Sequence, residues 1–399
     1  MLLRSKKFLL GLLILIILAI FAYLNYAFNF LNKPAERGQI VNLLSSPDKN
    51  LNQSQKSVDY KIVEFTRGLY VPWSIVFTSK SRMLVSERNG NIREIKDGSL
   101  TQKPLIELKE TVEVGESGLM GLSIHPNYSF NKYVYACLTY VVDGKMVNKI
   151  ERFVDKGDNL ARDKIILDGI PSARFHAGCR IGFGPDEKLY VTVGDASVRE
   201  EAQNLNSLAG KILRINDDGS IPSDNPFGTL IWSYGHRNPQ GIAWQPESGI
   251  LFSTEHGPSG SDGPGGGDEI NIIKKGFNYG WPIVSHEKSR DGLEKPKLIF
   301  TPAEAPSGAS FYGGDVFPQF KNNFFFTALR GEGLFRVILG EDNPEEIIGY
   351  EKIKEVNFGR IRDVLEGPDG LIYFVTSNRD GRGKPREGDD KIYRFEPIW

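Results

Sequence analysis

"EKLYVTVGD" (187–195) and, after a polar stretch, "GKILRI" (210–215) decide the fold. The first segment is a short strand signal, and the second follows the pattern Gly-x-apolar-x-Arg-apolar. Related strand pairs recur along the chain. The copies of the second segment are "GNIREI", "NKIERF", "GKILRI", "DEINII", "GLFRVI" and "KIYRFE", with marker positions Ile92, Ile150, Ile212, Ile270, Leu334 and Ile392. Successive markers are 58, 62, 58, 64 and 58 residues apart.

A near-constant period with at least two strands per repeat predicts radial repetition. Six copies predict an all-β, six-bladed β-propeller over residues 58–399, in which each blade interface buries its own apolar layer. The early strand "VDYKIVEF" (58–65) is expected to pair with the last blade and close the ring. A β-sandwich pair or two barrels is the alternative, but neither explains the regular spacing.

The first 30 residues differ from the rest. The uncharged apolar run 8–30 is long enough to cross a bilayer as a helix. Arg4, Lys6 and Lys7 precede it, so the propeller is expected on the outer (periplasmic or extracellular) side. Because no Ala-x-Ala-like site follows, an uncleaved membrane anchor (1–30) is favoured over secretion after signal cleavage. The polar segment 31–57 is predicted to be a flexible linker.

The charge and cysteine content exclude some classes of protein. The formal net charge is −1, so no overall positive field attracts nucleic acid, and no nucleic-acid partner is expected. Cys137 and Cys179 are too few for a disulfide framework. We expect two buried free thiols, since free cysteine packs as a small apolar residue, and a single bridge is the alternative.

His176 lies just ahead of the strand in 187–195, and Asp195 ends that strand. A carboxylate near a histidine can fix its tautomer and raise its basicity. A buried structural histidine is the alternative. Because the loops at one end of a propeller usually carry the chemistry, and arginines gather in the same loops, we favour a general base.

One polar loop lies between two apolar strands. "SYGHRNPQGIAW" (233–244) contains Arg237, Asn238 and Gln240. A planar guanidinium beside an amide suits a flat ligand that bears carboxylates. A well-satisfied turn with a solvated arginine would look the same in sequence.

A second group of arginines follows further along the chain. Arg360 and Arg362 alternate in "GRIRDV" (359–364), so both side chains are expected to project to one side of a strand. Arg330 lies in "LRGEGLFRV" (329–337). Like charges on one face favour an anion between them, whereas surface arginines with solvated head groups are the alternative.

A glycine-rich stretch (255–282) contains Glu269 and Tyr279, with Asp262 and Asp268 nearby. Carboxylates and backbone carbonyls are the ligands that Ca²⁺ prefers, although the spacing is not that of an EF-hand. The run "SGSDGPGGG" (259–267) is alternatively a flexible insertion.

Five motifs in order resemble the soluble pyrroloquinoline quinone (PQQ)-dependent sugar dehydrogenases, the glucose/sorbosone and aldose sugar dehydrogenase family. They are "GESGLMGLSIHPNYSFNKYVY" (115–135), "HAGCRIGFGPDEKLYVTVGD" (176–195), "GHRNPQGIAW" (235–244), "HGP…GGDEINIIKKGFNYGWP" (256–282) and "GRIRDV" (359–364). The resemblance covers about residues 58–399, and the family is a six-bladed propeller.

The resemblance implies an oxidoreductase that oxidises C1 of an aldose to a lactone, with PQQ and Ca²⁺ as cofactors. His176 matches the catalytic base, and Asp195 would orient it. The positions matching cofactor contacts are Glu116, Arg237, Asn238, Gln240, Arg330, Arg360 and Arg362. The positions matching calcium ligands are Gly257 and Pro258, through their carbonyls, and Glu269 and Tyr279 in the aldose branch.

Four departures bear on the substrate and the cofactor, and one of them is the insertion "SGSDGPG" (259–265), which lengthens the metal loop. Glu116 stands where relatives often have glutamine, and a carboxylate beside an anionic cofactor would repel it unless protonated or metal-bound. Cys179 replaces a common glycine, and Phe175 precedes the base where relatives often have Asp or Asn. Neither cysteine belongs to a Cys-x-x-Cys-His haem motif, so an external acceptor, a quinone or a cytochrome, is expected.

Two other functions remain open on the same fold, because fold does not determine function. A non-catalytic, membrane-tethered propeller could bind carbohydrate or protein. A calcium-dependent lactonase would share the metal but would not need paired arginines. The full set of base, arginines and metal loop favours the dehydrogenase.

Overall fold

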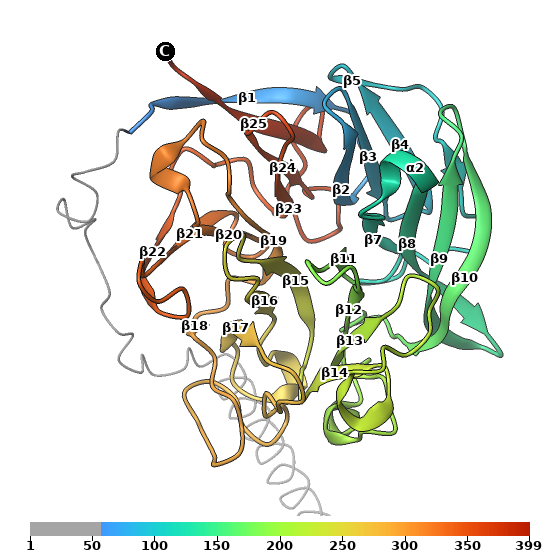
Figure 1. Cartoon of the computed structure of the whole chain (residues 1–399), viewed down its shortest axis with the longest axis vertical. Helices are drawn as coiled ribbons and strands as arrows, with labels where there is room; N and C mark the ends of the chain where they lie inside the picture. The colour runs from blue at the N-terminus through green and yellow to red at the C-terminus, as the bar shows by residue number, and fades with distance from the viewer. Residues whose placement is uncertain (1–56) are drawn as a thin grey trace, which may run out of the picture.

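The computed structural model describes residues 57–399. The strands form six sheets around a common centre (Figure 1), which confirms the predicted six-bladed β-propeller. The predicted membrane anchor (1–30) and residues 31–56 of the predicted linker lie outside the described residues. Within 57–399, no helix is both long and apolar enough to span a membrane.

Each blade is an antiparallel sheet whose three inner strands follow one another outward from the centre in chain order. The first three blades are β2 (Pro72–Ser79), β3 (Arg82–Glu87), β4 (Asn91–Lys96), β5 (Ser99–Leu100) and β6 (Ile106–Glu107); β7 (Leu119–Ile124), β8 (Tyr133–Val142), β9 (Lys145–Asp155) and β10 (Leu160–Pro171); and β11 (Ile181–Phe183), β12 (Leu189–Val193), β13 (Lys211–Ile215) and β14 (Ile231–Tyr234). The next two are β15 (Pro239–Trp244), β16 (Leu251–Glu255), β17 (Asp268–Ile273) and β18 (Leu298–Phe300); and β19 (Pro306–Phe311), β20 (Phe324–Ala328), β21 (Gly333–Leu339) and β22 (Ile347–Lys352).

The last blade closes the ring. It contains β23 (Ile361–Glu366), β24 (Ile372–Thr376) and β25 (Lys391–Pro397), and the first strand of the described residues, β1 (Tyr60–Arg67), pairs antiparallel with β25. Figure 1 shows β1 and β25 side by side. This pairing confirms the predicted closure, which ties the two ends of the propeller together by main-chain hydrogen bonds.

The helical segments are short and lie in loops. They are α2 (Tyr128–Asn131), η1 (Arg199–Gln203), η2 (Pro226–Gly228), η3 (Gly260–Asp262) and η4 (Pro318–Phe320).

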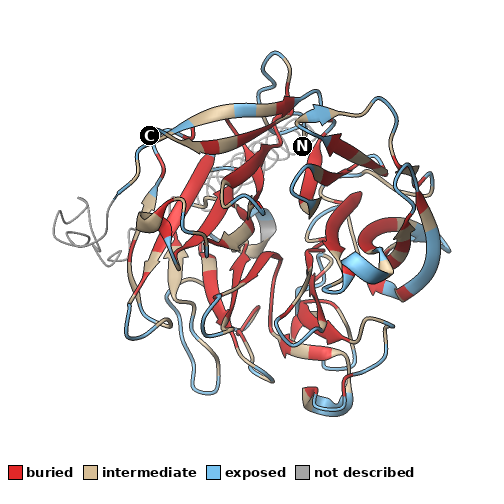
Figure 2. Ribbon diagram, turned by 45° about the horizontal axis from the view of Figure 1, so that its top comes forward, coloured by how far each residue is buried: buried red, intermediate tan, exposed pale blue. Residues whose placement is uncertain are grey.

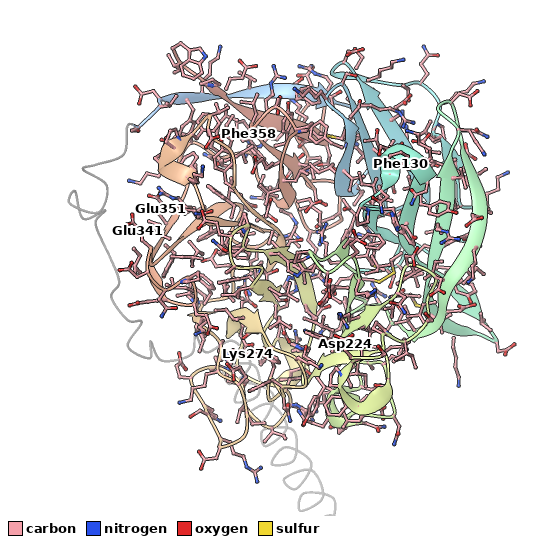
Figure 3. The ribbon with its side chains drawn as sticks, in the orientation of Figure 1. Phe130, Asp224, Lys274, Glu341, Glu351 and Phe358 are labelled. Atoms are coloured by element: carbon pink, nitrogen blue, oxygen red, sulfur yellow. A yellow bond between two sulfur atoms is a disulfide. The ribbon has the colours of Figure 1, made fainter. Side chains whose placement is uncertain are left out.

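The core lies between neighbouring blades. All six marker residues of the repeat sit in the third strands of their blades and are fully buried. Between the fourth and fifth blades, Phe252 packs against Phe311 and Phe324 with ring centroids 5.2 and 5.4 Å apart. Figure 2 shows buried residues concentrated in the strands and exposed ones in the loops. In Figure 3, Glu341 and Glu351 lie at the outer edge of the fifth blade, away from the centre.

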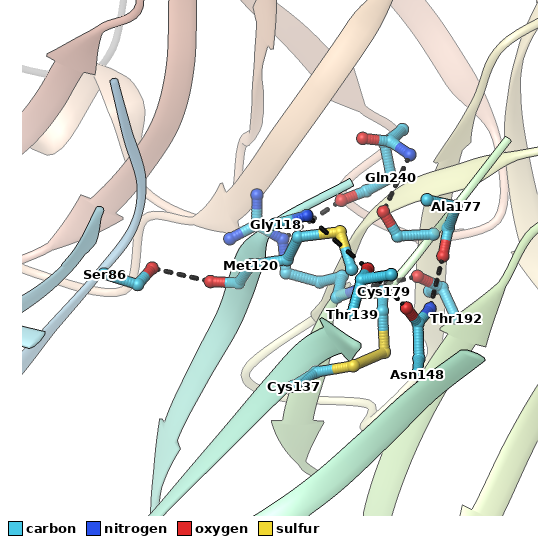
Figure 4. The surroundings of a disulfide bond; sticks show 12 residues. Ser86, Gly118, Met120, Cys137, Thr139, Asn148, Ala177, Cys179, Thr192 and Gln240 are labelled. Atoms are coloured by element: carbon cyan, nitrogen blue, oxygen red, sulfur yellow. Dashed lines mark hydrogen bonds between the residues drawn. A yellow bond between two sulfur atoms is a disulfide. The ribbon is translucent and has the colours of Figure 1, made fainter. Parts of the chain in front are cut away.

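The expectation of two free thiols is wrong, because Cys137 and Cys179 form a disulfide (Figure 4). Cys137 belongs to β8, and Cys179 to the segment that enters β11, so the bridge joins the second blade to the third. Sequence alone left this open because the two residues are 42 positions apart and become neighbours only when the blades stack. The Asn148 side chain donates to Ala177 O at 2.8 Å and ties the same segment to the second blade.

Replacing both cysteines by alanine is expected to destabilise the propeller. Removing a cross-link that closes a loop of this length restores entropy to the unfolded chain and costs about 4 kcal/mol in the chain-entropy model. The free energy of unfolding in urea, compared for the double variant and the oxidised parent, measures the loss. Reduction of the parent with dithiothreitol should reproduce it. An unchanged unfolding midpoint in both experiments would contradict the prediction.

Candidate functional site

Two sets of loops meet at one end of the ring. The segments that enter the innermost strands carry His176, Arg237 and Arg360, and the loops that follow the second strands carry Asp195 and Asp380. In each blade the first strand leads away from this end and the second returns to it, so both sets of loops face the same side. The fold therefore gathers residues from several blades at one mouth.

His176 and Asp195 form a close pair. The Nδ1 atom of His176 lies 2.7 Å from Oδ1 of Asp195. The same Asp195 oxygen accepts the backbone N–H of Ser197, and Oδ2 accepts the indole N–H of Trp281 at 2.8 Å. With these two N–H groups already donated to it, Asp195 acts as an acceptor at both oxygens, and a carboxylate can only accept from Nδ1 as well. Nδ1 therefore carries the ring proton, and Nε2 retains its lone pair.

The backbone aims the imidazole of His176. His176 has a φ of 57°, in the left-handed region, and its backbone N–H donates to Glu116 Oε2 at 2.9 Å. A Cβ atom on Gly194 would lie 2.0 Å from the His176 carbonyl oxygen, so only glycine fits there. Among the described residues, Nε2 of His176 has no hydrogen-bond partner, which leaves it available to a ligand.

Two adjoining cavities meet at His176. The first, of about 380 Å³, we call the arginine cavity, and the second, of about 610 Å³, the side cavity. Both are lined by Glu116, His176, Ser259 and Arg382. The arginines that line the first are Arg88, Arg237, Arg330, Arg360, Arg362 and Arg382, and its carboxylates are Glu116, Asp268 and Asp380. Six cations against three anions give its lining a formal net charge of +3.

The predicted arginine pair lines this cavity from the last blade. Arg360 donates to Asp380 through Nε at 2.8 Å and through Nη2 at 2.7 Å. Arg362 lies 4.0 Å from the same carboxylate, and its Nε atom is buried with no partner among the described residues. Burial lowers the pKa of Arg362 to about 9, and the neighbouring Arg360 and Arg88 add to this effect. An anion in the cavity would relieve this repulsion.

Arg237 is already paired. Its guanidinium donates to Asp262 of η3 at 2.6 and 3.0 Å and to the His256 carbonyl oxygen at 3.2 Å. It also lies over the Trp281 ring, 5.5 Å from the centroid. The insertion at 259–267 therefore has a defined contact with the mouth. Arg330 is exposed at the mouth, and no carboxylate among the described residues forms an ion pair with it.

Glu116 forms hydrogen bonds both with the backbone of His176 and with the side-chain amide of Asn238. Its Oε2 accepts the His176 N–H and the Asn238 side-chain N–H, and its Oε1 lies 3.6 Å from Arg382. Burial alone would raise the pKa of Glu116, but His256, His176 and Arg382 lower the pKa below its usual value. The carboxylate is therefore charged, with the Arg382 guanidinium as its ion-pair partner, and the repulsion expected from replacing glutamine is reduced only by that pairing.

Asn238 and Gln240 support the base rather than standing free. Asn238 is fully buried and accepts Gln240 Nε2 at 3.0 Å. Gln240 also donates to the Gly178 carbonyl oxygen at 3.3 Å, as Figure 4 shows, and lines the arginine cavity. Asn238 does not line that cavity.

The chain is similar to known proteins both in sequence and in structure. The sequence model of the glucose/sorbosone dehydrogenase family matches residues 69–392. This chain belongs to the glucose/sorbosone dehydrogenase family. Among solved structures, a putative oxidoreductase (glucose dehydrogenase) of Thermus thermophilus is 41% identical, with a TM-score of 0.78 over 85% of this chain and all of that one.

The names of two further relatives refer to the quinone cofactor. The PQQ-bound aldose sugar dehydrogenase of Streptomyces coelicolor is 33% identical, with a TM-score of 0.75, and covers 86% of this chain and 100% of that one. Quinoprotein glucose dehydrogenase B of Acinetobacter calcoaceticus is 33% identical over 88% of this chain and 93% of its own length. By its family, the chain is a sugar oxidoreductase of the quinoprotein kind.

The arginine cavity of this family member fits PQQ. The cofactor is flat and bears three carboxylates, and the lining offers a formal charge of +3 with a buried guanidinium nitrogen that lacks a partner among the described residues. Guanidinium groups match carboxylates in charge and in their forked geometry.

The predicted calcium ligands are in two separate places. Gly257 and Pro258 line the arginine cavity; the Pro258 carbonyl oxygen accepts the Gly266 N–H at 3.3 Å, and that of Gly257 has no hydrogen bond among the described residues. The described residues hold no group of three or more His, Cys, Asp and Glu side chains suited to a metal. A cation there would need ligands from the cofactor in addition to these carbonyls.

Glu269 and Tyr279 do not line the arginine cavity. Glu269 pairs in register with Glu255 on the neighbouring strand, and burial, with the charge of Glu255, raises the pKa of Glu269 to about 8. The Asn271 side-chain oxygen beside it is buried without a partner among the described residues. A cation fits this charge pattern, but Tyr279 could contribute only its carbonyl, because its hydroxyl donates to Ile272 O.

Sequence reasoning missed several residues of the site in this dehydrogenase-family chain. Arg88, His256, Asp380 and Arg382 line the arginine cavity, and Trp281 holds Asp195. A usable signal was present, because Arg88 and Asp380 follow second strands just as Asp195 does. Inspecting the residues that follow the second strand of every repeat would have identified Arg88 and Asp380 as candidates.

Proposed function

We propose that this chain oxidises the anomeric C1 of an aldose to the lactone with PQQ as the immediate electron acceptor. The observation that carries the proposal is the free Nε2 of His176, oriented by Asp195, at the junction of an arginine-lined cavity and a second cavity. The arginine cavity would hold the anionic cofactor and the side cavity the sugar. With this assignment, His176 lies between the cofactor and the sugar.

When bound, PQQ would supply a two-electron acceptor for the hydride of C1. The carbonyl oxygens of Gly257 and Pro258 would hold Ca²⁺ in part, and the ion would supply a Lewis acid. Nε2 of His176 accepts the proton of the anomeric hydroxyl. Asp195 keeps the imidazole in the productive tautomer and stabilises the imidazolium that forms, because the two charges are in direct hydrogen-bond contact. General-base assistance of this kind is worth roughly 10²–10⁴ in rate.

The competing functions suit the site less well. A neutral carbohydrate or a lactone would leave the surplus positive charge of the arginine cavity uncompensated, which is costly for buried guanidinium groups.

The sequence lacks a haem-attachment motif, so the electrons would pass to an external quinone or cytochrome. The apolar run at 8–30 supports export, with the propeller on the outer side of a membrane or secreted.

Reconstitution tests this proposal directly. The purified protein is incubated with PQQ and Ca²⁺, freed of excess by gel filtration, and examined for retained quinone absorbance. We expect one PQQ retained per chain and loss of the oxidised quinone spectrum when an aldose is added. A parallel sample with EDTA reports the contribution of the metal. A protein that retains no quinone, or retains quinone that no aldose reduces, would contradict the proposed activity.

A further inference from the structure

The charges in the arginine cavity are not equally available to a ligand. Asp380 pairs with Arg360, Asp262 pairs with Arg237, and Glu116 lies 3.6 Å from Arg382. Asp268 accepts backbone N–H groups from three residues at 2.7 Å each. Among the described residues, Arg88 and Arg330 form no ion pair, and Arg362 reaches only Asp380, at 4.0 Å, a carboxylate that Arg360 already binds.

Arg88 is the least expected of these three. It follows β3 directly and is only 4% exposed. Its Nε and Nη2 atoms donate to the Ser117 carbonyl oxygen at 3.2 and 3.0 Å, and Nη2 also donates to the Gly115 carbonyl oxygen at 2.7 Å. These bonds fix the plane of the guanidinium and use one side of it. Nη1 makes no hydrogen bond among the described residues, and Arg88 lines the cavity.

The environment of Arg88 favours an anionic ligand. Carbonyl oxygens orient the cation but carry no full charge that could neutralise it. Burial lowers the pKa of Arg88, whereas Glu113, Asp380 and Glu116 act in the opposite direction without forming an ion pair with it. Arg362 stands close enough for its own pKa to be lowered by Arg88. Two buried cations that repel each other across a cavity are stabilised when a carboxylate enters between them.

We infer that Arg88, together with Arg362, is the principal anchor for a carboxylate of the bound anion, and that Arg237 is not. Arg237 and Arg360 are neutralised by Asp262 and Asp380, so they shape the walls of the cavity and add little net attraction. The inference rests on the proposed function for the identity of the ligand as PQQ. It assigns a binding residue in the first blade, whereas the sequence-predicted cofactor contacts that bear positive charge come from the fourth, fifth and sixth.

The affinity of the full-length protein for PQQ tests the inference. Equilibrium titrations followed by quinone absorbance are compared for the parent, Arg88→Gln, Arg88→Lys and Arg67→Gln. Because a hydrogen bond between charged groups contributes about ten- to a hundredfold in affinity, Arg88→Gln is expected to raise Kd by about that factor. Arg67→Gln removes the same charge from an exposed arginine of β1 that pairs with Glu64 and lines neither cavity, and it should leave Kd unchanged.

Arg88→Lys guards against a folding defect, because lysine keeps the charge and can still donate to the Ser117 carbonyl oxygen. It should bind PQQ more weakly than the parent, since an ammonium cannot serve the carbonyls and a carboxylate in the same fork. Thermal unfolding of each apoprotein verifies that it is folded. A folded Arg88→Gln protein with the parent Kd would overturn the inference, and if that variant does not fold, a parent-like Kd for Arg88→Lys would do so.

A second probe separates this inference from the proposed function. Benzene-1,3,5-tricarboxylate is a flat trianion without a quinone, and its binding is measured by calorimetry in the same variants. If the parent binds this probe through Arg88 but does not bind PQQ, the proposed function fails and the anion site stands. If the parent binds neither, both fail. If it binds PQQ equally with and without Arg88, only the inference fails.

Discussion

His176→Ala is expected to retain PQQ and to oxidise aldoses about 10²–10⁴-fold more slowly than the parent. The imidazole contributes little to the arginine cavity's charge, so cofactor affinity should hardly change. The proton of the anomeric hydroxyl, however, then loses the imidazole nitrogen that is open to it at the junction of the two cavities, because Nε2 of His176 has no other hydrogen-bond partner among the described residues. Turnover with a soluble dye as acceptor, measured at saturating PQQ and Ca²⁺, gives the ratio.

His125→Ala is the matched control for this loss. His125 follows the far end of β7, where its ring lies 5.2 Å from that of Phe183, and it lines neither cavity. Removing this imidazole should leave turnover at the parent value. Full activity in His176→Ala would show that another group takes the proton. Loss of bound quinone in that variant would instead assign the residue to cofactor binding.

The number and order of the blades could be predicted because the same strand pattern recurs six times in the sequence at a nearly constant spacing. Each of the six markers is a buried residue of a third strand, so burial requires an aliphatic residue, Ile or Leu, at the same place in every blade. The closing strand β1 was predictable for a related reason, since the last repeat provides only three strands and a strand from the start of the propeller completes its four-stranded blade.

The pairing of side chains across blades could not be read in the same way. Cys137 and Cys179 look like two isolated small residues until β8 and the segment entering β11 lie together. Likewise, Arg237 resembles a free cation in sequence, and only the fold brings Asp262 against it. The motifs thus located the mouth of the propeller, whereas the charge available there depends on contacts between distant loops.

Asp195→Asn is expected to reduce turnover on the order of 10²-fold or more, approaching the loss in His176→Ala. The buried carboxylate accepts from His176, Ser197 and Trp281 at once. An amide has only one oxygen, so it must present its NH₂ group either to Trp281 or to the imidazole. In the second orientation Nδ1 becomes an acceptor, Nε2 takes the proton, and the base is blocked. In either orientation the imidazolium loses its counter-charge.

Trp281→Phe separates the role of the carboxylate from that of its surroundings. Phenylalanine keeps an aromatic ring under Arg237 but removes the single N–H that Oδ2 accepts. The other two donors and the negative charge remain, so turnover should fall far less than in Asp195→Asn. Both variants are compared for kcat at saturating aldose with equal amounts of bound quinone. Parent-like kcat in Asp195→Asn would mean that the tautomer of His176 is set by something other than this carboxylate, and the assigned path of the proton would then be wrong.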